Sequence, residues 1–181
     1  MAQGLLIIDM QNDYFRGGAM ELVNIDEAAG KCARVLRCFR EKGAPVFHVQ
    51  HIATRPGATF FLPHTPGCAI HESVRPLPGE PVIVKHFPNS FRETGLKQLL
   101  DAAGVDEVVI CGAMTHLCID TTVRAAFDLG LQCVVVADGC ATKDLTFKGH
   151  KVSAHDVQLS FLAALGTPFA AIRSAEECIA A

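Results

Sequence analysis

The sequence has no cluster of lysine and arginine residues, and its formal net charge at pH 7 is −3. Proteins that bind nucleic acid or an anionic membrane usually carry a basic patch, so we expect neither partner. No apolar run reaches the ~18 residues that a membrane-spanning helix needs. No basic segment followed by an apolar one opens the chain, as it would in a secretion signal. These absences predict a cytoplasmic protein whose partner is a small molecule.

Metal-binding and disulfide patterns are missing as well. No two of the eight cysteines form a CxxC pair, which leaves a thiolate zinc site without its usual spacing. A disulfide framework is not expected in a chain with a large apolar core and no secretion signal. We therefore expect most of the thiols to be reduced and buried, at positions Cys32, Cys38, Cys68, Cys111, Cys118, Cys133, Cys140 and Cys178.

The glycine-rich fingerprint of dinucleotide-binding proteins is also absent. The turn after the first apolar run reads DMQND, from Asp9 to Asp13, where that fingerprint would have GxGxxG. Two carboxylates in this turn would repel a pyrophosphate. We therefore expect no dinucleotide and no other cofactor.

Short apolar runs alternate with amphipathic segments along the whole chain, residues 1–181. The runs predict strands over residues 5–9, 45–51, 82–85, 107–111, 132–137 and 169–172. The segments between them predict helices over residues 26–42, 93–104, 118–130 and 153–166, with a last helical turn over 175–179. This alternation is typical of an α/β fold with a six-stranded, mostly parallel sheet and helices on both faces. With no linker or repeat, we expect a single domain.

Three chemically complementary residues lie at or just beyond the ends of predicted strands: Asp9, Lys85 and Cys118. In parallel sheets these ends share one edge, where ligands bind. Cys118 falls at the first turn of a predicted helix, which favours a thiolate. Asp9 can take the thiol proton, and Lys85 can hold that carboxylate ionised. The alternative is that Cys118 is a buried apolar side chain.

A cysteine nucleophile attacking a carbonyl also needs hydrogen-bond donors for the developing negative charge. The turn Gly112 to Leu117 precedes the predicted helix. Within and just after it, the backbone N–H groups of Met114 and Cys118 are the best placed to form such an oxyanion hole.

Three stretches together resemble the isochorismatase-like cysteine hydrolase family, which includes nicotinamidases and other small-amide hydrolases. They are IIDMQNDYFRGGAME, VIVKHFPNSF and GAMTHLCIDTTVRAAFDLG, in the order of the family. The resemblance implies a three-layer α/β/α, Rossmann-like fold and a catalytic Asp, Lys and Cys at positions 9, 85 and 118. It also implies a thioester intermediate, a cis peptide between Ala113 and Met114, and a homodimer or homotetramer. The vinyl-ether hydrolases of the family lack the nucleophilic cysteine, so Cys118 favours hydrolysis of an amide or related C–N bond.

Nicotinamidases carry a metal site on an Asp-x-His pair just after the second strand. Here the matching residues read Val49-Gln50-His51, so the carboxylate is missing. His48, His51, His64 and His71 show no standard ligand spacing, so we expect them to be hydrogen-bond donors in loops and in the pocket, and we expect no metal. A zinc-assisted nicotinamidase remains an alternative, as does a non-catalytic binding protein on the same fold.

Residues near the three catalytic candidates are expected to form the substrate pocket. Tyr14 or Phe15, and Phe60 or Phe61 in the long segment 52–81, are candidates to enclose a flat or apolar substrate. Gln11, Thr115 and His116 are candidates for hydrogen bonds to it.

Overall fold

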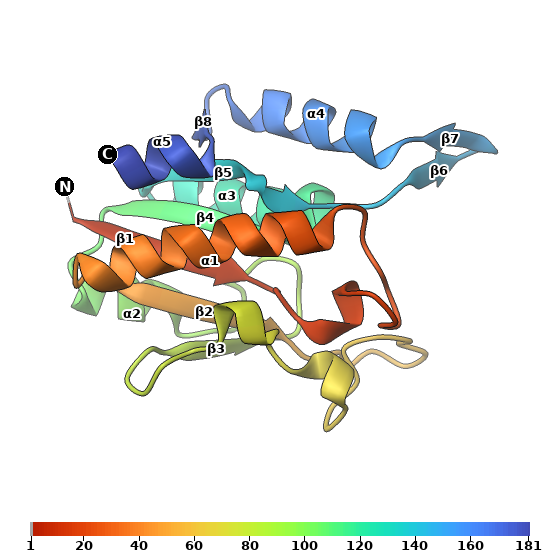
Figure 1. Ribbon diagram of the computed structural model, residues 1–181, viewed down its shortest axis with the longest axis horizontal. Helices are drawn as coiled ribbons and strands as arrows, with labels where there is room; N and C mark the ends of the chain where they lie inside the picture. The colour runs from red at the N-terminus through yellow and green to blue at the C-terminus, as the bar shows by residue number, and fades with distance from the viewer. Residues whose placement is uncertain (1) are drawn as a thin grey trace.

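The computed structural model describes residues 2–181 and is built around a twisted, six-stranded sheet (Figure 1). Its strands are β1 (Gln3–Ile8), β2 (Val46–His51), β3 (Val82–Lys85), β4 (Glu107–Ala113), β5 (Gln132–Ala141) and β8 (Ala171–Arg173). They lie in the order β3-β2-β1-β4-β5-β8, and each neighbouring pair is parallel. The order changes direction between β1 and β4. After β1 the chain adds β2 and β3 on one side of it, and then adds β4, β5 and β8 on the other side. This is where parallel sheets form ligand crevices.

Helices cover both faces of the sheet, and this confirms the predicted three-layer α/β/α fold. The helices are α1 (Ile25–Glu41), α2 (Leu96–Ala102), α3 (Asp120–Asp128), α4 (Ala154–Leu165) and α5 (Ala175–Ala180). On one face α1 and α5 pack over Leu5 and Ile7 of β1, and on the other face α2, α3 and α4 pack over Leu6 and Ile8. Because successive strand residues face opposite sides, a strand buried on both faces reads as one continuous apolar run.

Several element boundaries differ from the sequence prediction. The helix expected over residues 118–130 begins at Asp120, and the preceding Thr115–Ile119 forms a π-helical turn. The strand expected over 132–137 continues to Ala141. A two-stranded antiparallel hairpin, β6 (Leu145–Phe147) and β7 (His150–Val152), was not expected and projects from the body of the molecule (Figure 1).

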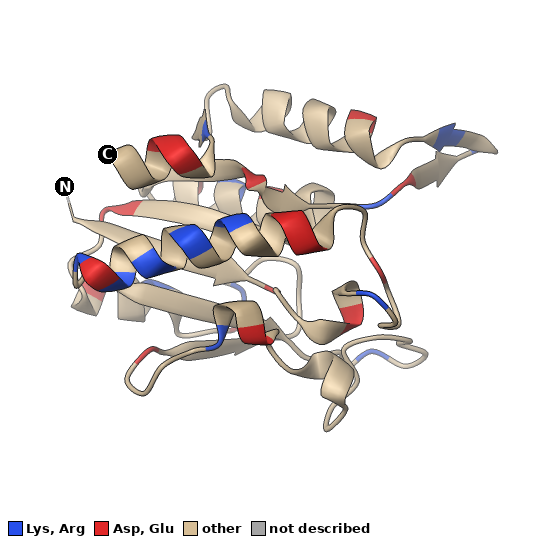
Figure 2. Ribbon diagram, in the orientation of Figure 1, with Lys and Arg blue, Asp and Glu red and all other residues tan. Residues whose placement is uncertain are grey.

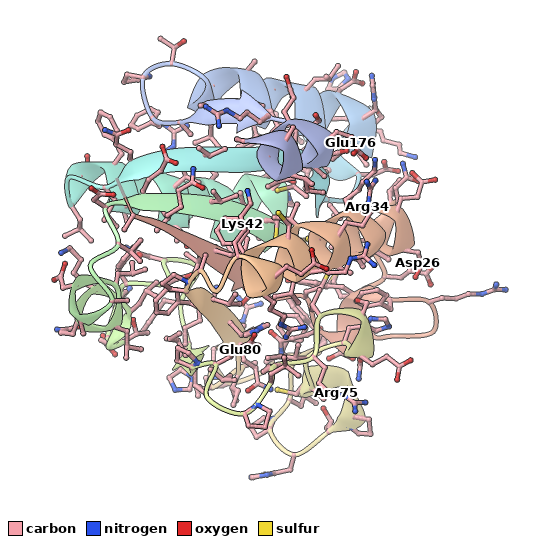
Figure 3. The ribbon with its side chains drawn as sticks, turned by 60° about the vertical axis from the view of Figure 1, so that its left-hand side comes forward. Asp26, Arg34, Lys42, Arg75, Glu80 and Glu176 are labelled. Carbon is pink, nitrogen blue, oxygen red and sulfur yellow. The ribbon has the colours of Figure 1, made fainter. Side chains whose placement is uncertain are left out.

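Ion pairs fasten the face that carries α1. Arg34 on α1 and Glu176 on α5 point toward one another (Figure 3), and one of their two contacts is a 2.9 Å hydrogen bond from Nη2 to Oε2. Further along α1, Arg40 donates from Nε and Nη2 to the two carboxylate oxygens of Glu80, each at 2.7 Å. These contacts fix the segment before β3 against α1.

None of the helices found in residues 2–181 combines the length and hydrophobicity that crossing a membrane requires.

Candidate active site

The three catalytic candidates meet at the edge of the sheet formed by the carboxyl ends of the strands. Asp9 directly follows β1, Lys85 is the last residue of β3, and Cys118 lies in the turn after β4. Lys85 Nζ lies 2.7 Å from Asp9 Oδ2, and both side chains are fully buried. The Cys118 sulfur lies within 4.8 Å of an Asp9 carboxylate oxygen. Side chains separated by up to 109 positions in the sequence thus come together, because the strands that precede them end at the same edge of the sheet.

The backbone at Asp9 is in an unusual conformation. Its φ is +50°, in the left-handed region that residues other than glycine seldom adopt. The Asp9 N–H still donates to Val49 O at 3.0 Å, which ties the residue to β2. Apart from the ion pair with Lys85, neither carboxylate oxygen has a hydrogen-bond partner within residues 2–181. This strained position therefore holds a buried carboxylate with acceptor capacity left for a thiol proton or a substrate.

Lys85 is held in its charged form. Besides the ion pair, its Nζ donates to the carbonyl oxygens of Phe87 and Pro88, each at 3.2 Å. Burial is the largest single influence and lowers the pKa of Lys85, but the charges of Asp9 and Cys118 and the hydrogen bonds to them together outweigh it, so the net shift is upward. The buried ammonium is therefore a permanent cation beside the Asp9 carboxylate and the Cys118 thiol.

Cys118 is buried and lies within the π-helical turn. The Met114 carbonyl accepts hydrogen bonds from the N–H groups of Leu117 (3.1 Å) and Ile119 (3.2 Å), and Cys118 lies between these two donors in the chain. The pKa of Cys118 is raised to about 12, chiefly by burial and secondly by the negative charge of Asp9, while Lys85 opposes both. The expectation that the free enzyme holds a thiolate is therefore wrong, because desolvation outweighs the cation and the start of the helix. A base must take the proton when the substrate is bound.

The backbones of β4 and β1 lie close together at Gly112. The peptide bond between Ala113 and Met114 is cis, which confirms the prediction from the family resemblance. One residue earlier, Gly112 has a φ of +130°, and a Cβ there would lie 1.9 Å from the Ile8 carbonyl oxygen. Glycine is required at this position because the backbones of the two strands leave no room for a side chain.

A cavity of about 400 Å³ opens onto Cys118. Its walls come from segments that follow β1, β2, β3 and β4, so four strand ends surround it. The lining residues are Tyr14, His51, Ala53, Thr54, Arg55, Ala58, Phe60, Phe61, His86, Phe87, Pro88, Met114, Leu117 and Cys118. Most of these side chains are apolar, with a few polar groups among them, as is usual for small-molecule sites.

Three of the aromatic residues proposed from the sequence line this cavity. Tyr14 and Phe61 are buried with ring centroids 4.6 Å apart, and Phe60 packs against Phe61 at 4.9 Å. Asp13 orders this group, because its Oδ2 accepts a 2.6 Å hydrogen bond from the Phe61 N–H. The chain after β1 and the chain after β2 therefore form one aromatic wall.

Four other residues proposed as substrate contacts lie outside the cavity lining. Phe15 stacks on His71, with ring centroids 3.6 Å apart. Thr115 donates to Ala141 O and Gln158 Oε1, and His116 pairs with Thr142 Oγ1 at 2.6 Å. The π-helical turn directs Thr115 and His116 toward β5 and α4 rather than toward Cys118.

Gln11 is the fourth of these residues, and it contacts the protein backbone. Its Oε1 accepts from the His51 N–H at 2.8 Å, and its Nε2 donates to the carbonyl oxygens of His51 (2.9 Å) and Cys68 (2.7 Å). Gln11 thus holds His51 in place from behind the cavity.

The chain is similar to proteins of one known family. The family model named isochorismatase domain matches residues 3–173. The chain belongs to the isochorismatase family. The isochorismatase-family protein YddQ of Bacillus subtilis is 51% identical over 176 residues, which cover 97% of this chain and 98% of the relative. Members of the family are hydrolases, so this chain is an enzyme and the alternative of a non-catalytic binding protein is set aside.

A further relative and a solved structure are also similar to the chain. A streptothricin hydrolase from Streptomyces noursei is 39% identical over 146 residues, which cover 79% of this chain and 51% of that protein. The crystal structure of an isochorismatase hydrolase from Oleispira antarctica superposes with a TM-score of 0.96 at 48% identity, covering 99% of this chain and 97% of that one.

Sequence reasoning missed several residues that line the cavity of this isochorismatase-family hydrolase, above all His51, Arg55 and His86 as polar groups. His51 ends β2 and pairs in register with Lys85 of β3. Its ring nitrogen, an Asp9 oxygen and the Cys118 sulfur all lie within 4.8 Å of one another. The position of His51 at a strand end was the available signal; the sequence favoured a loop or pocket hydrogen-bond donor over a metal ligand there but did not single His51 out as a neighbour of Asp9 and Cys118.

A metal of the nicotinamidase type does not fit these residues. Val49 is buried where that branch has a carboxylate, and His71 is stacked on Phe15. The one group of three potential ligands found among residues 2–181 is Asp9, His51 and Cys118. Two of these are the catalytic candidates, and the Lys85 ammonium at 2.7 Å from Asp9 would repel a divalent cation there.

Proposed function

We propose that this chain cleaves the C–N bond of a small carboxamide through a thioester on Cys118. The observation that carries this proposal is the buried ion pair of Asp9 and Lys85, within reach of a thiol that opens onto an apolar cavity. A protonated thiol next to a carboxylate with free acceptor capacity is suited to nucleophilic attack with general-base assistance.

In the first half of the reaction, Asp9 takes the thiol proton as Cys118 Sγ attacks the carbonyl carbon. The carbonyl π electrons move to oxygen, and the N–H groups of Met114 and Cys118 donate to this oxyanion. The tetrahedral intermediate then collapses. The C–N bond breaks, Asp9 passes the proton to the leaving nitrogen, and an amine or ammonia departs from a thioester.

In the second half of the reaction, Asp9 acts again as the base. It takes a proton from a water molecule whose oxygen attacks the thioester carbon. The C–S bond breaks, the sulfur recovers a proton from Asp9, and a carboxylic acid is released. Lys85 keeps Asp9 ionised at the start of each half-reaction, because the carboxylate stabilises the charge of Lys85 despite its burial.

A thiol nucleophile favours an acyl substrate over a vinyl ether. Attack on a carbonyl carbon gives a thioester, whereas cleavage of a vinyl ether proceeds by protonation of carbon and has no use for Cys118. The apolar walls of the cavity also suit a small organic amide better than a charged polymer.

The first test measures ammonia release from nicotinamide, maleamate and N-carbamoyl compounds by the wild type and by Cys118→Ala. We expect activity in the wild type and none in the variant, together with an acyl adduct on Cys118 detectable by mass spectrometry. Cys133→Ala is a matched control, because Cys133 is a buried thiol on β5 outside the cavity lining. Activity that survives in Cys118→Ala would exclude the thioester.

A further inference from the structure

The cavity carries one permanent charge on its walls. Among its lining residues within the described part of the chain, Arg55 is the only lysine, arginine, aspartate or glutamate. The other polar lining groups, such as Thr54, His51 and His86, carry no permanent charge. An anionic group of a bound molecule would therefore meet attraction on this wall and no carboxylate to repel it.

Arg55 has no anionic partner among the described residues, 2–181. Arg34, Arg40 and Arg124 each contact a carboxylate, whereas no carboxylate of residues 2–181 lies within ion-pair distance of Arg55. Arg55 is also the only lysine, arginine, aspartate or glutamate from residue 52 to residue 71. Figure 2 shows this loop after β2 in tan with a single blue segment. A guanidinium exposed at the cavity and left unpaired is available to a ligand.

The charges behind the cavity do not cancel that of Arg55. Asp9 is already paired with Lys85 at 2.7 Å. The pKa of His51 is lowered, chiefly by burial; Asp9 opposes the shift, while Lys85, His86 and Arg55 contribute to it. The charge of Arg55 is thus felt at His51, next to the reacting groups. The cavity thus has one unpaired cation on its wall, and the buried pair of Asp9 and Lys85 behind Cys118 carries no net charge.

The walls between these two ends are flat and apolar. Phe60, Phe61 and Tyr14 form one side, and Phe87 and Leu117 lie in the segments that follow β3 and β4. Aromatic faces of this kind suit a planar ring or a short hydrocarbon body. The cavity therefore provides a thiol, an apolar middle and a guanidinium.

We propose that the substrate is an amide that also bears a carboxylate, separated from the scissile bond by a flat or apolar body, and that Arg55 binds this carboxylate. The proposal rests on the proposed amide hydrolysis at Cys118 and assigns its substrate class. Arg55 acts here as a specificity-determining residue and takes no part in bond cleavage.

The experiment compares benzamides that differ in the charge of one substituent. At pH 7.5, ammonia release is measured from 3- and 4-carboxybenzamide, which are anionic, from 3- and 4-methylbenzamide, which are neutral, and from 4-(aminomethyl)benzamide, which is cationic. We expect the wild type to favour an anionic member in kcat/KM. Arg55→Met is expected to lower kcat/KM for that member by about tenfold, chiefly through KM, with the methyl compounds unchanged.

Two further variants control for charge and fold. Arg37→Met removes an exposed arginine of α1 that does not line the cavity, and it should leave the whole series unchanged. Arg55→Lys should retain part of the anion preference, because lysine keeps the charge but loses the bidentate geometry. A loss in Arg55→Met that Arg55→Lys does not restore at all would contradict charge recognition.

Binding to Cys118→Ala separates the substrate class from the reaction itself. Isothermal titration with the same five amides is expected to show the tightest binding for an anionic member, and this preference should be lost when Arg55→Met is added. Equal binding of neutral and anionic members, or no anion-selective binding at all, would overturn the role of Arg55 even if the amidase activity stands. Amide hydrolysis that persists in Cys118→Ala would instead contradict the proposed function.

Discussion

At the scale of single residues, the chemistry depends on a thiol that is protonated in the free enzyme. Burial is the main cause of the raised pKa of Cys118, about 12, and the Asp9 carboxylate adds to it. Asp9 therefore has two opposite effects in the proposed mechanism: it disfavours the thiolate at rest, and it accepts the proton during attack.

Replacing Asp9 separates these two effects. In Asp9→Asn the negative charge is lost while Lys85 remains, so the pKa of Cys118 falls and more thiolate is present at pH 8. We expect iodoacetamide to alkylate Cys118 at least about tenfold faster at this pH, while amide hydrolysis is lost. Peptide mass spectrometry over a pH series measures the alkylation rate. Lys85→Met is the opposite control, because losing the cation should slow alkylation; slower alkylation in Asp9→Asn would contradict the assigned electrostatics.

Gln11 acts through His51, because it hydrogen-bonds both the N–H and the carbonyl of that residue. In Gln11→Leu these buried backbone groups lose their partner, and we expect a loss of about 1–3 kcal/mol in the free energy of unfolding. We also expect kcat to fall, because His51 lies among the reacting groups. Urea unfolding and steady-state kinetics measure the two effects.

Gln50→Leu provides the comparison for Gln11. Gln50 donates one hydrogen bond to Cys68 O at 2.9 Å and none to the His51 backbone. Gln50→Leu should therefore lower the free energy of unfolding by less than Gln11→Leu does and leave kcat unchanged. Equal effects of the two substitutions on kcat would argue against a positioning role for Gln11.

At the scale of elements, the closest approach in the sheet is between β1 and β4 at Gly112. A Cβ there would overlap the Ile8 carbonyl, and the φ of +130° is unfavourable for any other residue. Gly112→Ala is expected to lower the free energy of unfolding by about 3 kcal/mol or more. Gly30→Ala in α1 meets no atom within 4 Å and should instead raise stability by about 0.5–1 kcal/mol. Chemical denaturation of both variants tests this contrast, and a harmless Gly112→Ala would refute the contact.

The segment before β3 is fastened by Glu80, labelled in Figure 3. Burial raises the pKa of Glu80, but hydrogen bonds from Arg40, the Leu77 N–H and His48 outweigh it and bring the pKa from 4.5 to about 2. A depressed carboxyl pKa contributes stability above pH 4.5, and this contribution is lost as the pH falls to about 2.

Glu80→Gln is therefore expected to cost of the order of 3 kcal/mol near neutral pH, with the difference from wild type shrinking between pH 4.5 and 2. Thermal or urea unfolding over this pH range measures it. Glu72→Gln is the control, because its contact with Arg75 is exposed and 3.8 Å long. A difference that does not depend on pH would show that the carboxylate charge is not the cause.

At the scale of the whole molecule, the hairpin of β6 and β7 leaves apolar surface uncovered. Phe147 is 71% exposed, and the hairpin lies outside the six-stranded sheet. Two strands alone are marginally stable in water, so a cover is expected. We propose that a second copy of the chain provides it, within a homodimer or homotetramer. Sedimentation should then give the mass of two or four chains and a lower mass for Phe147→Lys, whereas a monomeric wild type would contradict this.

The sequence was sufficient for features that depend on local pattern. Buried parallel strands read as apolar runs, and their carboxyl ends share one edge, so the contact among Asp9, Lys85 and Cys118 followed from strand ends alone. The hairpin was missed because its strands have three residues each and its turn depends on positive φ at Lys148 and Gly149. Thr115 and His116 were placed in the site because nothing in their sequence shows the extra residue of a π-helical turn.

The cavity wall was harder to predict than the reacting groups, because it forms only when four loops converge. Arg55 lies in a segment without a periodic pattern of apolar residues. Whether its side chain lines the same cavity as Cys118 depends on how the loop after β2 folds. Tyr14, Phe60 and Phe61 were expected near the site as large apolar side chains next to catalytic candidates. Their mutual packing depends on the Asp13 side chain, which no pattern of hydrophobicity reveals.

The reacting groups and the cavity wall of this enzyme come from different parts of the sequence. The groups proposed to transfer protons and form the thioester are anchored to strand ends, whereas much of the cavity wall lies on one continuous stretch, residues 53–61. Exchange of that stretch between relatives would change the accepted amide without disturbing the reacting groups. New specificities can thus arise in evolution, or be made in the laboratory, by replacing a single short piece of the gene.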